Sequence, residues 1–297
     1  MSNRKTSHTR TLKAIIFDLD GTIAETEDAH RAAFNRAFAA AGLDWSWDPH
    51  TWSGLLEIAG GRNRLHAWLA DNRPELLQGP QATHLLDTLH GAKDRLYREI
   101  LEAGEIPLRP GIRALIDEAR ADGVKIAIAT TSRRAIARRV IECCLGEGAL
   151  AWFDAFLGHE DATYRKPHPD IYRRAAARLR LRPRDCLALE DSAIGVASAV
   201  AAGVPVVATV NAYSGDRPFE GALAVLSDLG AEAAPFRRMA GPAEPAQTPA
   251  RAGLALLSAW HEAAVAPGRD GSADRRRRAA DGARRLSDNL LATSFRP

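Results

Sequence analysis

The chain has 297 residues, with 46% hydrophobic and 26% charged residues, which is ordinary for a soluble globular protein. Three cysteines are too few for a disulfide framework, and the polar, basic start has no apolar run of the secretory type, so we expect a cytoplasmic protein. The net charge of +3 comes from the C-terminal part, because residues 231–297 hold 11 arginines against 7 acidic residues. The remainder of the chain is close to neutral.

The first apolar run, residues 12–17, predicts a buried strand. Two carboxylates, Asp18 and Asp20, follow it at once, and then come Gly21 and Thr22. A strand that only packs has no use for acids at its carboxyl end, whereas open α/β sheets bind ligands in the crevice at that end. Asp18 is therefore the candidate nucleophile.

A long helical segment separates this strand from the next one. Periodic apolar residues predict helices at 25–41, 52–59, 63–71 and 83–103. The next strand, 124–129, begins about a hundred residues after the first, whereas a plain βαβ unit needs only ~30. We therefore expect a helical insert that acts as a lid over the acidic strand end.

From residue 110 onward, strands and helices alternate, which predicts a parallel sheet with helices on its faces. The expected strands are 124–129, 155–158, 186–189, 204–210 and 224–226, and the expected helices are 110–123, 133–145, 171–181 and 193–202. The expected organisation is a core from residues 1–22 and 108–230, a helical cap at 23–107, and a linker with a basic, disordered tail at 231–297. Within the last segment, residues 251–265 can form a short helix. The apolar stretch 193–210 is broken by Gly203 and Pro205, so no membrane span is expected.

Polar side chains follow several of the predicted strands. They are Asp18 and Asp20, Thr130 to Ser132, and Glu190 with Asp191, while Lys166 lies just past a fourth strand. In a parallel sheet these ends share one edge, so acids, hydroxyls and an ammonium group converge. Carboxylates repel a phosphate dianion, and a hard divalent cation that bridges both removes this repulsion. The mixture therefore predicts a phosphate site with Mg²⁺ as cofactor.

Chemical type and position then suggest roles. Asp18 would attack phosphorus and bind Mg²⁺, and Asp20 would act as acid and base while its backbone carbonyl binds the metal. Asp191 would complete the protein ligands, with Glu190 beside it as a ligand or supporting group.

The phosphate oxygens need donors and a positive charge in the same crevice. The Thr130 hydroxyl and the backbone amides from Thr131 onward would hold them, and Lys166 would neutralise the charge that grows during transfer.

These residues carry a family resemblance. The motifs are Asp18-Leu19-Asp20-Gly21-Thr22, Thr130, Lys166-Pro167 and Glu190-Asp191. They resemble the four motifs of the haloacid dehalogenase-like phosphatases, which implies Mg²⁺-dependent phosphatase activity on a Rossmann-like core with a helical cap of type C1. Further segments resemble the CbbY group of that superfamily, namely Ala24-Glu25-Thr26-Glu27, His30, Trp45-Ser46-Trp47 and Ile58-Ala59-Gly60-Gly61-Arg62-Asn63-Arg64. That group is associated with carbon fixation and dephosphorylates sugar bisphosphates such as xylulose-1,5-bisphosphate.

The resemblance also implies substrate contacts in the cap. Glu25 and His30 would face the sugar, and Arg62 and Arg64 would hold a distal phosphate, which arginine binds in a bidentate manner. The family usually has Gly-Gly-Lys-Glu-Arg here, whereas this chain has Arg62 and Asn63 in place of the lysine and glutamate. The departure bears on substrate identity and not on the phosphoryl chemistry.

Other interpretations stay open. Thr130 to Ser132 can cap a helix, Glu190 and Asp191 can begin one, and Arg62 and Arg64 can form a solvated face. A mutase of the β-phosphoglucomutase type would use the same aspartyl phosphate, and a metal-free dehalogenase would not need Asp20 or Asp191. The arginine run 275–278 permits a non-catalytic interaction protein, although no nucleic-acid-binding motif accompanies it. We expect a monomer with a sugar phosphate as its partner.

Overall fold

The computed structural model describes residues 11–266 except 57, 59, 215–217 and 243–248. Within them, a sheet of strand order β3-β2-β1-β4-β5-β6-β7 forms the centre. The strands are β1 Ala14–Phe17, β2 Lys125–Ala129, β3 Ala155–Leu157, β4 Cys186–Glu190, β5 Val206–Thr209, β6 Ala224–Leu226 and β7 Arg238–Ala240. Strands β1 to β6 run parallel, and β7 pairs antiparallel to β6. The predicted α/β fold with a parallel sheet is confirmed.

Strand β1 lies between β2 and β4, and this register gathers the polar strand ends. Phe17 is level with Ile128 on one side and with Leu189 on the other. The residues that follow these three strands therefore meet at one edge. Alternate residues of β1 point to opposite faces, so Ile15 and Phe17 join one hydrophobic cluster and Ile16 joins the other.

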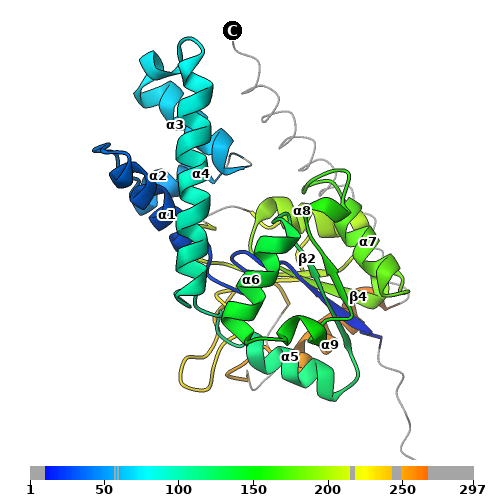
Figure 1. Cartoon of the computed structure of the whole chain (residues 1–297). Coiled ribbons are helices and arrows are strands. Elements are labelled where there is room, and N and C mark those ends of the chain that lie inside the picture. The colour runs from blue at the N-terminus through cyan, green and yellow to red at the C-terminus, as the bar shows by residue number, and fades with distance from the viewer. Residues whose placement is uncertain (1–10, 57, 59, 215–217, 243–248, 267–297) are drawn as a thin grey trace, which may run out of the picture.

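Helices cover both faces of the sheet (Figure 1). One cluster contains the apolar sides of α5 Ile112–Ala121, α6 Arg134–Leu145 and α9 Leu254–Val265. The other contains those of α7 Asp170–Arg178 and α8 Ala193–Ala202. Short 3₁₀ helices lie at Pro74–Leu77, Ala149–Trp152, His159–Asp161 and Pro183–Asp185.

Four helices between β1 and α5 form a separate bundle, seen from blue to cyan in Figure 1. They are α1 Glu27–Ala40, α2 Pro49–Leu55, α3 Gly61–Asn72 and α4 Gln81–Glu102. Their own core is rich in aromatic side chains, including Phe34, Phe38, Trp47 and Trp52. We call this bundle the cap. The packing explains the tryptophans of this segment, which fill the cap core.

The two chain segments that join the cap to the sheet pair with each other. The Glu25 amide donates to the Pro107 carbonyl at 3.0 Å, and the Arg109 amide donates to the Ile23 carbonyl at 2.9 Å. The predicted limits of the cap, residues 23 and 107, fall in these paired linkers.

Part of the segment after residue 231 is folded onto the core, and it includes a helix within the range 251–265. Strand β7 extends the sheet beside β6, and α9 packs against α5 with Leu254, Leu257 and Trp260 buried. These residues recur every three positions, so one helix face is apolar and finds a partner in the core. Residues 267–297, which include the arginine run 275–278, lie outside the described residues.

The apolar stretch 193–210 forms α8, a turn at Gly203 and β5, as expected. No helix in the described part of the chain combines the length and the apolar character needed to cross a membrane.

Candidate active site

Lys166 connects two of the polar strand ends. It lies in the loop before α7, and its ammonium donates to Asp18 Oδ1 at 2.5 Å and to Glu190 Oε1 at 2.6 Å. Tyr172, on α7, donates to the same Glu190 oxygen at 2.5 Å, and Ser192 donates to Oε2 at 3.2 Å. The Glu190 oxygens thus accept three protein hydrogen bonds, so this side chain holds Lys166 in place.

Burial dominates the charge balance around Asp18. It raises the pKa of Asp18 to about 8, although the Lys166 ammonium opposes the shift. Burial alone would lower the pKa of Lys166, but Asp18 and Glu190 outweigh it and raise that pKa, so the lysine stays charged.

Asp191 is held at the same edge by two parts of the chain. Its carboxylate accepts from Thr22 Oγ1 at 3.3 Å and from Asn211 Nδ2 at 2.7 Å. Gly21 has a φ of +79°, and a Cβ at this position would overlap the Asp191 carboxylate. Burial and the neighbouring Asp18 and Glu190 carboxylates raise the pKa of Asp191 well above its ordinary value.

The donor set fits a hard divalent cation. Oxygens of Asp18, Glu190 and Asp191 lie within 4.8 Å of one another, and all three side chains are buried or partly buried. The ammonium of Lys166 offsets only part of this negative charge. Mg²⁺ prefers carboxylate, carbonyl and water oxygens, so the predicted metal side chains come together where such an ion would bind.

Asp20 is oriented by the segment after β2. Its Oδ2 accepts from Ser132 Oγ at 2.6 Å and from Thr130 Oγ1 at 3.3 Å. Its Oδ1 is buried and has no hydrogen-bond partner among the described residues. One carboxylate oxygen is thus fixed, and the other is free to exchange a proton with a ligand. The sequence placed Ser132 among the polar residues after this strand but did not indicate its contact with Asp20.

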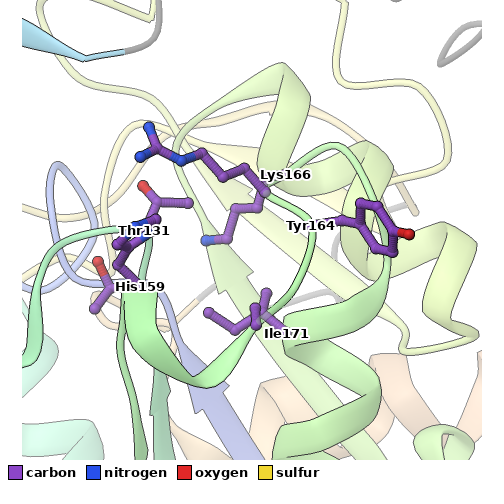
Figure 2. A pocket seen from close by; sticks show the side chains of 8 residues that line it. Thr131, His159, Tyr164, Lys166 and Ile171 are labelled. Atoms are coloured by element: carbon purple, nitrogen blue, oxygen red, sulfur yellow. The ribbon is translucent and has the colours of Figure 1, made fainter.

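A pocket opens beside these groups, lined by Thr130, Thr131, His159, Ala162, Tyr164, Arg165, Lys166 and Ile171. Figure 2 shows the Lys166 side chain extending into this pocket, whereas the Tyr164 ring points away from it. The predicted phosphate-binding residues Thr130, Thr131 and Lys166 therefore line the same pocket.

Glu25 forms an ion pair with Arg109. It lies in the first linker, where its carboxylate accepts from the buried Arg109 guanidinium at 2.7 Å. Glu27 lies two residues later, on α1. The charges of Asp20 and Arg64 both influence its pKa. Burial raises the pKa of Glu27 to about 7, and its carboxylate accepts from Trp52 Nε1 at 3.2 Å. The sequence reasoning missed Glu27, although its spacing of three from His30 puts both on one helix face.

His30 lies on that face and stacks on Tyr97 with ring centroids 3.9 Å apart. Burial, together with the nearby Lys93 and Arg64 cations, lowers the pKa of His30 well below its ordinary value. Its Nδ1 has no partner among the described residues. A neutral imidazole with a free nitrogen can bind a hydroxyl group. No sequence pattern pointed to Lys93, whose ammonium lies over the Phe34 and Tyr97 rings.

The two predicted arginines have different surroundings. Arg62 is exposed and pairs with Asp87 at 2.7 Å. Arg64 donates to the carbonyls of Leu55 at 3.2 Å and Ile58 at 2.9 Å, and its guanidinium lies over the Trp52 ring. Arg64 and Glu27 thus share Trp52, whereas Arg62 belongs to the outer surface of the cap.

The chain matches the family model described as haloacid dehalogenase-like hydrolase over residues 12–203. It is 43% identical to "Protein CbbY, plasmid" of Cupriavidus necator over 251 residues, which cover 84% of this chain and 97% of that protein. The crystal structure of CbbY from Rhodobacter sphaeroides in complex with phosphate has a TM-score of 0.65 and 37% identity, covering 73% of this chain and 94% of that one. A mutant of the same protein in complex with xylulose-(1,5)bisphosphate has the same TM-score and identity, covering 75% and 98%. The resemblance expected from the motifs is confirmed, and the chain belongs to the haloacid dehalogenase-like hydrolases, within their CbbY group.

Proposed function

We propose that this phosphatase hydrolyses a sugar bisphosphate, with xylulose-1,5-bisphosphate as the first candidate, through an aspartyl phosphate on Asp18. The observation that carries the proposal is that Asp18 and Asp20 have different hydrogen-bond partners. Asp18 lies against the Lys166 ammonium, and Asp20 is oriented by Ser132 and keeps one oxygen free. The sugar-bisphosphate complex of the related CbbY protein supports the substrate class.

In the first step, an Asp18 oxygen attacks phosphorus, the bond from phosphorus to the sugar oxygen breaks, and Asp20 gives its proton to that oxygen. In the second step, Asp20 takes a proton from water, the water oxygen attacks phosphorus, and the Asp18 carboxylate leaves. Lys166 stays beside Asp18 throughout and offsets charge on the transferring group.

Asp18, Asp191 and the Asp20 backbone carbonyl would hold Mg²⁺, with Glu190 fixing Lys166 beside them. When bound, this ion neutralises the repulsion between the carboxylates and the phosphate.

The cap would recognise the rest of the substrate. Arg64 and Lys93 are partly or fully buried cations near His30 and Glu27, so they offer charge to a second phosphate where solvent screening is weak. Arg62 would first have to leave Asp87 to take part. Glu25 would act through the linker that it shares with Arg109 and not by touching the sugar.

A phosphate-release assay tests the proposal. Mono- and bisphosphorylated pentoses and hexoses are compared with and without a chelator, and the sugar products are followed in parallel. We expect release from bisphosphates at least tenfold faster than from monophosphates, and loss of release with the chelator. Interconversion of sugar phosphates without free phosphate would instead indicate the mutase. Full activity of Asp18→Asn would refute the aspartyl phosphate.

A further inference from the structure

A short loop after β5 touches both the catalytic edge and the cap. We call residues 211–214 the 211–214 loop. Asn211 Nδ2 donates to Asp191 Oδ2 at 2.7 Å, and Ser214 Oγ donates to the Asp191 carbonyl at 2.9 Å. The loop therefore grips Asp191 at its side chain and at its backbone.

The loop is also braced internally. The Asn211 amide donates to Ser214 Oγ at 3.0 Å, and the Tyr213 amide donates to Asn211 Oδ1 at 2.8 Å. The Asn211 side chain is thus tied to Tyr213 at one end and to Asp191 at the other. A shift of Tyr213 would be passed to the amide group that holds Asp191.

Tyr213 belongs to the cap in its packing, although the loop comes from the sheet. Its ring is 8% exposed and is part of the hydrophobic cluster formed by the cap residues. Its hydroxyl donates to Asp28 Oδ1 on α1, and Arg31 fixes Asp28 with a hydrogen bond of 2.9 Å. A movement of α1 would therefore pull directly on Tyr213.

The start of the loop is fixed at the linkers. Arg109 donates to the Val210 carbonyl at 2.6 Å and to Glu25 at 2.7 Å. The loop is thus attached to the linker through Arg109, to the cap through Tyr213 and to Asp191 through Asn211. Its position follows that of the cap.

We propose that Tyr213 is a positioning residue, which couples the place of the cap to the geometry of Asp191 through Asn211. When the cap sits as in this structure, the Tyr213 to Asp28 hydrogen bond orders the loop, and Asp191 is held ready for a cation. When the cap moves away, this bond breaks and the grip on Asp191 loosens. The inference rests on the proposed function in one respect, that Asp191 binds a divalent cation.

The test measures metal binding without substrate or turnover. Mn²⁺ is titrated into the full-length protein, and the free ion is quantified by electron paramagnetic resonance. Tyr213→Phe and Asp28→Ala each remove the same hydrogen bond, and we expect each to weaken Mn²⁺ binding about 5-fold. The double variant should be no weaker than either single one, because one contact is lost in all three. Asn211→Ala should weaken binding about 10-fold or more, since it removes the donor to Asp191.

Arg36→Ala is the matched control. Arg36 also lies on α1, but it forms an exposed pair with Glu105 at 3.5 Å. Its removal should leave Mn²⁺ affinity unchanged.

If Tyr213 only packed the cap, Tyr213→Phe, which keeps the ring, would leave Mn²⁺ affinity unchanged, and this result would overturn the inference. Additive losses in the double variant would overturn it as well. A wild-type protein that binds no Mn²⁺ would instead refute the metal site of the proposed function, and the coupling with it. Wild-type binding with an unchanged Tyr213→Phe refutes the coupling alone.

Discussion

The Lys166 ammonium lies 2.5 Å from Asp18 Oδ1 in a buried setting, and Glu190 accepts from the same ammonium. Replacing Lys166 by Met should lower kcat by about 10²–10³-fold, because a donor to the reacting centre is lost and two buried carboxylates lose their counter-charge. Phosphate release at saturating Mg²⁺ measures this. Lys125→Gln, which removes only a contact to the Leu179 carbonyl, should keep wild-type turnover.

Ser132 should act on the rate through Asp20. Ser132→Ala removes the shorter of the two hydrogen bonds to Asp20 Oδ2 and leaves that of Thr130. We expect kcat to fall about tenfold with little change in KM, since an acid that is free to rotate is less often in place. Steady-state kinetics decide the matter. A change confined to KM would show that Ser132 binds substrate instead.

Mutations of the two cap arginines, Arg62 and Arg64, should differ in their effects on stability and on KM. Arg62→Ala breaks an exposed pair with Asp87, so the free energy of unfolding should change by less than about 1 kcal/mol. Arg64→Ala removes hydrogen bonds to two backbone carbonyls and should cost about 1–3 kcal/mol. It should also raise KM for a bisphosphate more than for a monophosphate. Equal KM changes for both substrates would argue against Arg64 as the distal phosphate site.

Helix α9 should contribute to stability. A chain that ends at residue 266 should unfold at the wild-type midpoint if residues 267–297 add nothing to the core. A chain that ends at residue 249 exposes the core surface covered by Leu254, Leu257 and Trp260, which is worth about 4–6 kcal/mol as an upper estimate. Urea unfolding compares the two. Equal midpoints would show that α9 packs only weakly.

His261 should make stability depend on pH. It is fully buried on α9, where one ring nitrogen contacts the Arg184 carbonyl at 2.9 Å and the other contacts Thr11 Oγ1 at 3.2 Å. Burial lowers the pKa of His261 below its ordinary value of 6.5. Below pH 6.5 the unfolded chain therefore binds more protons at this histidine, so the contribution of His261 to the free energy of unfolding falls with falling pH and is constant above that value.

The control for this titration is His261→Gln. Below pH 6.5, its free energy of unfolding should depend less on pH than that of the wild type. Urea unfolding at intervals between pH 5 and pH 8 provides the comparison. An identical slope in both proteins would assign the pH dependence to other groups.

The sequence by itself determined the parallel sheet and the carboxylates at its edge. A short apolar run that ends in Asp18 and Asp20 is compatible with few folds. The alternation of strands and helices after residue 110 indicates that the strands are parallel. Once the strands are parallel, their carboxyl ends must meet, which brings Thr130, Lys166 and Asp191 to Asp18 whatever the details of packing.

Only the tertiary structure decided the contacts of the cap residues. Glu25 and Glu27 look equivalent in the sequence, but one lies in a linker beside Arg109, 84 residues away, and the other begins α1. Tyr213 and α9 were likewise invisible as partners, because long-range packing depends on the spatial match of distant surfaces. Local periodicity shows which face of an element is buried, and only the folded chain shows what buries it.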